Sequence, residues 1–445
     1  MRMEVCHSNH LATEGLSAVA GSISILEVGP CFSSHPVSFA LLTTGTMQFV
    51  GYYDELGEMT VASRRLDSLD WMKVQLGERV GWDSHNGMAL GWSCPGELHL
   101  SGNMHASSLV YFRTTRADDI RSFERKPGMT GSLESEVTYP NFFYGPETEL
   151  HFGYRHGSSG RGDQIYNSYN ADAQQWERPS GEPVVSGEGI RNAYLDGPVY
   201  GPDGFFHLCW VWRDTPDCST NHDVCYARSS DFVHWETSGG VPLKLPITAS
   251  GAEVIDPVPV GAGLLNGNVR VGFDAGMRVV VTYHKVDASG NTQIYNARRE
   301  SGGWKIFKTS DWTGTWLPEG NGTIEGIIGV HPVRVDQSGR LLLPYRHRDH
   351  GNGIWILDPV ALRPLGALAG LDSQLPEEFQ IAGDGMKRNW VKEIRPAARE
   401  QSGPVFALTW ESLPENRDKP RSAVPVPSCL KLVRFVNASE VFLNF

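Results

Sequence analysis

Arg155 lies inside an alternating stretch, 151-HFGYRHGSSGRGDQIYNSYN-170, which predicts two strands joined by a turn. A strand interior disfavours an unpaired charge, so Arg155 either forms a salt bridge or faces an anion. The guanidinium is always charged and can bind a carboxylate through two parallel hydrogen bonds. The glycines of GSSGRG predict a hairpin turn rather than a phosphate-binding loop, because no Gly-Lys-Ser/Thr follows. Arg155 is therefore a candidate for binding an anionic ligand.

Side chains that could transfer protons or bind a polar ligand are scattered along the chain. Histidine and tyrosine are general acids and bases when a reacting group lies within hydrogen-bond reach. The candidates are His85 in 82-WDSHNG-87, His105 in 101-SGNMHASSLVYFRT-114, Tyr139 before a proline in 137-VTYPNFF-143, His222 in 219-STNHDVCYARS-229, and His284, Lys285 and Gln293 in 281-VTYHKVDASGNTQIYNAR-298.

Each candidate also has a purely structural interpretation. A histidine beside Asp or Asn in a turn more often stabilises the turn, and a tyrosine before proline is commonly packed at a strand end. Arg155 could pair with an acid of its own sheet. Asp83 with His85, and His222 with Asp223, could be metal ligands, but neither pair has a specific spacing such as HExxH.

A loosely recurring unit indicates how the chain positions these residues. Five segments each follow a β run, end in an aromatic residue and lead into another strand. The aromatic residues are Trp71, Phe123, Trp176, Trp235 and Trp304, spaced 52, 53, 59 and 69 residues apart. Long periods of this kind are typical of propeller blades with four antiparallel strands each. The 445 residues therefore predict an all-β, seven-bladed β-propeller in one domain over residues 1–445, with unrelated hairpins in a sandwich as the alternative.

A propeller binds ligands at one mouth, where loops from several blades converge, so its functional residues should be scattered in the sequence. Ring closure predicts that the N- and C-terminal strands share one blade. The candidate strands lie in 22-SISILEV-28 and 435-FVNASEVFLNF-445, while 364–403 is less β-like and could be an insertion.

The composition limits the partners. A net charge of −12 and a pI near 5.7 argue against nucleic acid or an anionic membrane, whereas an acidic sugar needs only a local basic pocket. No apolar run approaches the length of a transmembrane helix, and the first residues lack the apolar region of a signal peptide. The seven cysteines include no CxxC pair, which favours buried thiols; one disulfide is compatible with the sequence, which does not determine its pairing.

Over nearly its whole length the chain resembles the seven-bladed β-propeller polysaccharide lyases of the BNR-repeat-like group, which include ulvan lyases and L-rhamnose-α-1,4-D-glucuronate lyases. The WVWRDTPDCSTNHD and QIYNAR stretches are more similar to the rhamnosyl-glucuronate branch. The chain departs from the family in GYYDELGEMTVA, where a basic residue is expected near Glu58. The stretches that carry the resemblance are HPVSFALLTTGTMQFVGYYDELGEMTVASRRLDS, VGWDSHN, SGNMH…LVYFRT, VTYPNFF, YRHGSSGRGDQIYN, WVWRDTPDCSTNHDVCYARS and VTYHKVDASGNTQIYNAR.

The resemblance implies cleavage by β-elimination, which removes the C5 proton of a uronate and expels the oxygen at C4. It implies that Arg155 neutralises the carboxylate and that Tyr139, His85 and His105 belong to the catalytic set, with the base and the acid unassigned. A tyrosine has a pKa near 10 and would need cationic neighbours to act as a base. The implied substrate-binding residues are His222, Arg213, Asn167, Tyr283, His284, Lys285 and Gln293.

The resemblance leaves other activities open. Related α-L-rhamnosidases hydrolyse the same linkage with a histidine on the opposite face, which here would be His35 in 34-SHPVSFALLT-43. An ulvan lyase and a non-catalytic sugar-binding propeller are further alternatives. We expect a secreted monomer that acts on an acidic polysaccharide such as gum arabic or an arabinogalactan. The chemistry requires no cofactor, although a structural calcium or zinc ion is compatible with the family.

Overall fold

Strands dominate the structure, a computed structural model that describes residues 23–368, 375–396, 403–422 and 424–436. Within these ranges the helical segments are one short helix, α1 (Glu377–Gln380), and two 3-10 turns, η1 (Ile120–Ser122) and η2 (Cys218–Thr220). The prediction of an all-β protein is confirmed, and α1 lies in the segment predicted to be less β-like. None of the described helices has the length and apolar character needed to cross a bilayer.

Four of the sheets are each built from strands that are consecutive or nearly consecutive in the chain. The first contains β2 (Ala40–Thr43), β3 (Met47–Tyr53), β4 (Glu58–Arg65) and β5 (Met72–Arg79), and the second β6 (Met88–Ser93), β7 (Glu97–Gly102), β9 (Tyr111–Thr114) and β10 (Phe123–Lys126). Two later sheets contain β21 (Arg270–Phe273), β22 (Val279–Val286), β23 (Thr292–Glu300) and β24 (Gly303–Lys308), and then β25 (Ile328–Val330), β26 (Arg334–Val335), β27 (Leu341–His347), β28 (Gly351–Leu357) and β29 (Pro364–Leu368).

The middle of the chain forms an eleven-stranded sheet. Its two halves meet through one parallel residue pair, Gly162 with Asn192. One half contains β8 (His105–Ser107), β11 (Val137–Tyr144), β12 (Leu150–Ser158), β13 (Arg161–Asn170), β14 (Gln175–Glu177) and β15 (Val185–Ser186). The other contains β16 (Asn192–Tyr200), β17 (Phe206–Arg213), β18 (Asn221–Ser229), β19 (Trp235–Glu236) and β20 (Glu253–Asp256).

The two ends of the described chain meet in the remaining sheet. Strand β1 (Ile23–Cys31) pairs with β32 (Ser428–Phe435), which continues into β31 (Val405–Ser412) and β30 (Lys387–Lys392). This confirms the predicted sharing of a sheet by the N- and C-terminal strands. Of the predicted C-terminal strand, Phe435 belongs to β32, and residues 437–445 lie outside the described residues.

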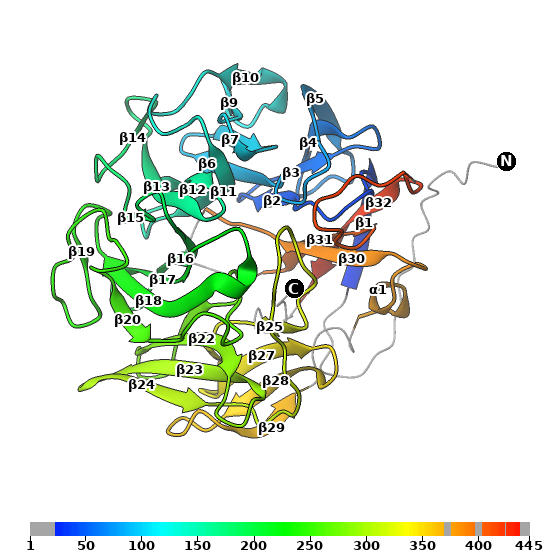
Figure 1. The fold of residues 1–445 in the computed structure, drawn as a ribbon. Helices are drawn as coiled ribbons and strands as arrows, with labels where there is room; N and C mark the ends of the chain where they lie inside the picture. The colour runs from blue at the N-terminus through cyan, green and yellow to red at the C-terminus, as the bar shows by residue number, and fades with distance from the viewer. Residues whose placement is uncertain (1–22, 369–374, 397–402, 423, 437–445) are drawn as a thin grey trace.

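Figure 1 shows the sheets arranged around a common centre, with β2, β6, β11, β16, β25 and β30 nearest to it. The five recurring aromatic residues mark the opposite side of three four-stranded sheets and of both halves of the eleven-stranded sheet. Trp71 directly precedes β5, and the others lie in β10, β14, β19 and β24; β5, β10, β19 and β24 end the strand order of their sheets, and β14 pairs with β13 beside that order. The recurring unit in the sequence therefore corresponds to the outermost strand of a repeated, propeller-like sheet.

Burial follows this arrangement. Strand β17, with the sequence FHLCWVWR, is buried at every residue, because its sheet packs against neighbours on both faces. Strand β5, with the sequence MKVQLGER, instead alternates between exposed and half-buried residues. Phe39, just before β2, stacks on Trp410 of β31 with ring centroids 4.3 Å apart, which packs the first sheet against the last. The six cysteines in the described part of the chain are free thiols.

Candidate active site

A pocket of about 240 Å³ gathers residues from strands and loops that are widely separated in the sequence. It contains the four residues predicted to be catalytic, together with the predicted ligand-binding residue Arg213. Its lining includes His85, His105, Tyr139, Arg155, Ser159, Tyr194, Arg213, Asn266, Thr323 and Asp418.

Three neighbouring strands place part of this set in one row. Thr138 of β11 lies opposite His105 of β8 on one side and opposite Arg155 of β12 on the other. The buried Thr138 hydroxyl accepts hydrogen bonds from the Arg155 Nη2 atom at 3.0 Å and from the Ala106 main-chain nitrogen at 2.8 Å. Thr138 thus fixes the arginine and the histidine-bearing strand to each other.

Irregular backbone directs the side chains at this edge. Ala106, Tyr139 and Asp223 have φ angles of 49°, 58° and 48°, in the left-handed region that non-glycine residues rarely adopt. Each lies where the pairing register of its strand shifts, as at a β-bulge. Bulges redirect side chains beside functional sites, and strained backbone persists where its surroundings hold it. The sequence gives no sign of these bulges.

Two guanidinium groups line the pocket without ion pairs among the described residues. Arg155 is 3% exposed, and its Nε and Nη1 atoms have no hydrogen-bond partner. Arg213 donates to main-chain oxygens and to Asn266 Oδ1 at 3.2 Å. Arg155 lies 5.0 Å from the ring centroid of Tyr139, and Arg213 lies 5.5 Å from that of Tyr194. Because a buried cation without a counter-ion is costly, this pair is suited to an anionic ligand.

A single carboxylate holds the two histidines. Asp83 Oδ1 lies 2.7 Å from His85 Nδ1, and Asp83 Oδ2 lies 2.5 Å from His105 Nδ1. The two imidazole rings stack with centroids 4.0 Å apart. An ionised carboxylate only accepts hydrogen bonds, so each Nδ1 carries a proton, and in the neutral form of each ring Nε2 is a lone-pair acceptor. The pair can therefore accept a proton from a ligand.

The ionisation of Asp83 supports this assignment of protons. Burial acts to raise the pKa of Asp83, but the hydrogen bonds from His105 and His85 outweigh it and hold the pKa well below its usual range. The ligand atoms of these three residues lie within 4.8 Å of one another, so the cluster can also hold a divalent cation. Nitrogen and carboxylate ligands of this kind suit zinc.

Tyr139 differs from the expectation that its cationic neighbours lower its pKa. Desolvation and the neighbouring Tyr194 raise the pKa of Tyr139, and they outweigh the opposite effect of Arg155 and Arg213. The side chain is 41% exposed, but it sits in a concave pocket where protein surrounds the phenol. The phenol therefore holds its proton at neutral pH and is suited to donate it.

Asp418 joins the site from the far end of the chain. It accepts hydrogen bonds from Ser84 Oγ at 2.6 Å and from the Thr323 nitrogen at 3.1 Å, and its Oδ2 atom lies 3.8 Å from His85 Nδ1. Sequence reasoning missed this residue, as it missed Tyr194 and Asn266. No local pattern marks Asp418, because its partners Ser84 and Thr323 lie in two other loops, 334 and 95 residues away in the sequence.

Six of the seven predicted ligand-binding residues lie outside this pocket lining, and His222 and Asn167 are two of them. His222 is held between two acids, with Nδ1 at 3.0 Å from Asp223 and Nε2 at 3.3 Å from Asp214. Asn167 is fully buried in β13 and accepts a hydrogen bond from Arg178. These contacts give both side chains structural roles.

The predicted residues of β22 and β23 also make contacts within the protein interior. Tyr283 and Lys285 both donate to Asp256 Oδ2 at 2.5 Å. Gln293 bonds to Ser310 and Trp312, and buried His284 stacks on Trp316 with centroids 5.2 Å apart. The structure therefore does not bring these four residues into the pocket with Arg155.

His35, the residue of the alternative hydrolase site, lies beside the loop that carries Asp83 and His85. Its ring centroid is 5.5 Å from that of Trp82. The side chain is buried, and neither ring nitrogen has a hydrogen-bond partner. Burial lowers the pKa of His35 against the opposing charges of Asp83 and Asp418.

Comparison with known proteins agrees with this architecture. The structure of polysaccharide lyase Uly1 matches with a TM-score of 0.62 and 14% identity, covering 94% of this chain and 100% of that one. An ulvan lyase of family PL25 matches with a TM-score of 0.55 and 13% identity, covering 91% and 94%, both alone and bound to -[GlcA(1-4)Rha3S]-. At such identities the likeness establishes a shared fold.

Searching the curated protein sequences gave no match. The sequence profile of the BNR repeat-containing family, in contrast, matches residues 47–312, more than half of the chain. The protein therefore belongs to the BNR repeat-containing family.

Proposed function

We propose that this protein is a polysaccharide lyase that cleaves the L-rhamnose-α-1,4-D-glucuronate linkage at chain ends by β-elimination. The observation that carries the proposal is the pair Arg155 and Arg213, two guanidinium groups without carboxylate partners among the described residues, beside Tyr139 and the Asp83-bound histidines. The shared fold with polysaccharide lyases supports the same class of reaction.

The arginines address the first obstacle to elimination. Removing the C5 proton places negative charge next to a carboxylate that is already anionic. Arg155 binds and neutralises this carboxylate, with Arg213 as the second cation of the pocket. Donors that are already in place when charge develops stabilise the transition state without reorganisation.

Proton transfer then divides between the histidines and the tyrosine. An Nε2 atom of the His85–His105 pair takes the C5 proton, because Asp83 holds the Nδ1 protons. Tyr139 donates its proton to the O4 atom as the C4–O4 bond breaks and the C4–C5 double bond forms. Rhamnose leaves with the O4 oxygen, and an unsaturated glucuronate remains.

Product analysis on gum arabic or an arabinogalactan tests the proposal. A lyase releases rhamnose together with the ultraviolet absorbance of the conjugated double bond. A hydrolase releases rhamnose without this absorbance, and a sugar-binding protein releases neither. Turnover of ulvan in place of the rhamnose-capped polymers would reassign the substrate. Rhamnose release without absorbance, lost in His35→Ala and retained in Tyr139→Phe, would replace the lyase by the rhamnosidase.

We further propose that the ring has seven blades in one domain, with the eleven-stranded sheet counted as two blades joined at the Gly162–Asn192 pair. The protein would act as a secreted monomer. The proposed steps need no cofactor. A zinc ion held by Asp83, His85 and His105 would occupy ring nitrogens that the proposed base uses, so it would be an alternative to that base role, and calcium prefers oxygen ligands.

A further inference from the structure

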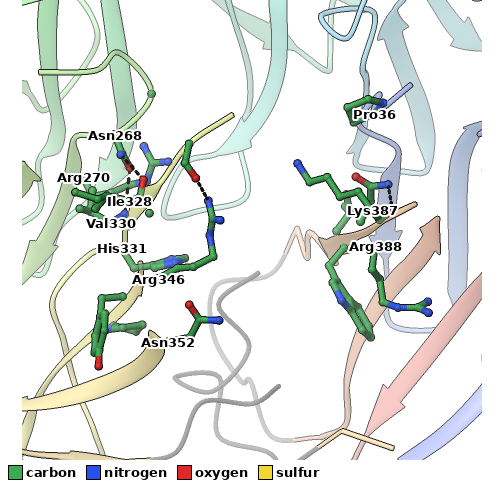
Figure 2. A pocket seen from close by; sticks show the side chains of 18 of the residues that line it. Pro36, Asn268, Arg270, Ile328, Val330, His331, Arg346, Asn352, Lys387 and Arg388 are labelled. Atoms are coloured by element: carbon green, nitrogen blue, oxygen red, sulfur yellow. Dashed lines mark hydrogen bonds between the residues drawn. The ribbon is translucent and has the colours of Figure 1, made fainter. Parts of the chain in front are cut away.

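A second and larger pocket lies at the centre of the ring, with a volume of about 760 Å³. This volume is within the range of small-molecule sites. Figure 2 shows side chains facing this space from two sides, with Arg346, His331 and Asn352 on one and Lys387 on the other. In a chain with net charge −12, four Lys or Arg side chains line it, and no Asp or Glu of the described residues does.

The cationic side chains of this central pocket differ in whether a carboxylate neutralises them. Lys387 pairs with Glu415, Arg388 pairs with Glu411, and Arg270 lies 3.4 Å from Asp196. Arg346 has no carboxylate partner among the described residues. Its guanidinium donates to the Gly326 main-chain oxygen at 3.1 Å, and the residue is exposed. Among these four lining cations, Arg346 is therefore the one without a carboxylate partner in the described part of the chain.

The rest of the wall is consistent with a positive potential. Burial lowers the pKa of His331 to about 4, and the charges of Arg270, Arg334 and Arg346 act in the same direction. The histidine is thus neutral at physiological pH and can still donate one hydrogen bond. Asn352 adds an amide on the same side. A wall with a free guanidinium and neutral donors suits an anion.

The central pocket adjoins the candidate active site. Leu265 and Asn266 line both pockets, and Asn266 also accepts a hydrogen bond from Arg213. A third pocket shares Ser38 with the central pocket, and shares His85 and Tyr139 with the candidate active site. One extended ligand can therefore reach from one pocket into the other.

We propose that the central pocket is an anion-binding subsite, in which Arg346 holds a second acidic group of the glycan whose uronate lies against Arg155. This inference rests on the proposed function. The acidic group is a carboxylate or a sulfate, since both present oxygen acceptors that match a guanidinium. The protein would then prefer chains that carry more than one anionic group near the cleaved end.

Calorimetric binding to the Tyr139→Phe protein tests the subsite without turnover. The probes are a rhamnosyl-glucuronate disaccharide with one carboxylate, a tetrasaccharide with two glucuronates, and a sulfated form of the disaccharide. We expect at least one of the doubly charged probes to bind about tenfold more tightly than the disaccharide, as for a hydrogen bond to a charged group. The probe that gains affinity identifies the group as carboxylate or sulfate.

Arg346→Gln, added to the Tyr139→Phe protein, should remove this gain. Arg348→Gln is the matched control, because Arg348 is exposed, pairs with Asp349 at 3.2 Å and does not line the central pocket. Asn352→Asp places a negative charge on the same wall and should also weaken the doubly charged probes. Melting temperatures show whether each variant is folded.

Equal binding of all three probes, or a gain that survives Arg346→Gln, would overturn the subsite. Failure of the proposed function gives a different result, namely no unsaturated product from any substrate with the unmutated protein. Binding differences that depend on Arg346 would then persist and describe a sugar-binding protein instead.

Discussion

Two regions of the ring carry the same residue types and use them differently. In the candidate active site the Arg155 guanidinium lies 5.0 Å from the Tyr139 ring, and on the β21–β24 sheet the Lys285 ammonium lies 4.9 Å from the Tyr295 ring. Lys285 and Tyr283 both bond to Asp256. Arg155 has no carboxylate partner among the described residues and keeps two nitrogen atoms without hydrogen bonds.

These two regions show that polar residue types identify a candidate site only when their hydrogen-bond and ion-pair partners are also known. A buried charge whose hydrogen bonds are satisfied within the protein stabilises one arrangement of the core. A buried charge left unsatisfied costs stability, and this cost is expected where a ligand supplies the missing partner. Substitutions in the first region should therefore change turnover, and those in the second should change stability.

The largest effect is expected for the two tyrosines. Tyr139→Phe removes the proposed acid and should lower kcat by about a thousandfold, within the usual range for general acid–base catalysis. Tyr283→Phe removes a buried hydrogen bond to Asp256 and should cost about 2 kcal/mol of unfolding free energy with kcat of the folded enzyme retained. Urea unfolding and steady-state kinetics on both variants check this. Loss of turnover in Tyr283→Phe, with normal turnover in Tyr139→Phe, would contradict the assignment of the two regions to stability and to turnover.

The cations give the next largest effect. Arg155→Lys keeps the charge but loses the planar fork, and the rate should fall about a hundredfold, or roughly 3 kcal/mol of transition-state stabilisation. Arg155→Ala should be slower still. Lys285→Met leaves the Asp256 carboxylate without its cation and should cost about 3 kcal/mol of stability. Normal turnover by a folded Arg155→Lys enzyme would remove Arg155 from the active site.

The unfolding free energy should change with pH by a similar amount, because His284 titrates. Burial lowers the pKa of His284 to about 4, below the value near 6.5 of an unfolded histidine. The unfolded chain binds the proton first, so the stability is full above pH 6.5 and is lost as the pH falls towards 4. His284 alone accounts for about 3 kcal/mol over this range.

Unfolding free energies at pH 7 and pH 4 measure this loss. His284→Gln should reduce the difference between the two pH values, although His151 and His331 titrate in the same range. His234→Gln is the control, because the His234 side chain is 85% exposed. An unchanged pH dependence in His284→Gln would contradict the assignment.

The smallest effect should come from Asp418, a positioning residue. Asp418→Asn removes a charge 3.8 Å from His85 Nδ1 and weakens the contacts to Ser84 and Thr323, so kcat should fall about tenfold. The activity should also shift along the pH axis, because one of the two acids near His85 is lost. Asp336 is the control, because it also accepts hydrogen bonds in a turn but lies elsewhere in the chain. Asp336→Asn should leave kcat and its pH dependence unchanged. A lower melting temperature with unchanged kcat and pH dependence would show that Asp418 has only a structural role.

Regular features of the fold could be predicted from the sequence because they repeat locally. The recurring aromatic residues mark outer strands of four of the sheets, and the alternation around Arg155 predicts β12 and β13. Arg155 could be singled out because a charge inside a strand is unfavourable unless a counter-ion or a ligand pairs with it. The bulge at Tyr139 could not, since backbone irregularity depends on strand pairing. Asp418 could not either, because its contacts join loops far apart in the sequence.

The ring closure has a consequence for how the protein is made. Asp418 lies between β31 and β32, and β32 forms the last described strand that pairs with β1. A ribosome has synthesised more than nine-tenths of these 445 residues before either is available. The earlier sheets can form during synthesis, but a nascent or clipped chain that lacks this final stretch has neither the pairing of β1 with β32 nor the acid beside His85. The same late step thus completes both the architecture and the candidate active site.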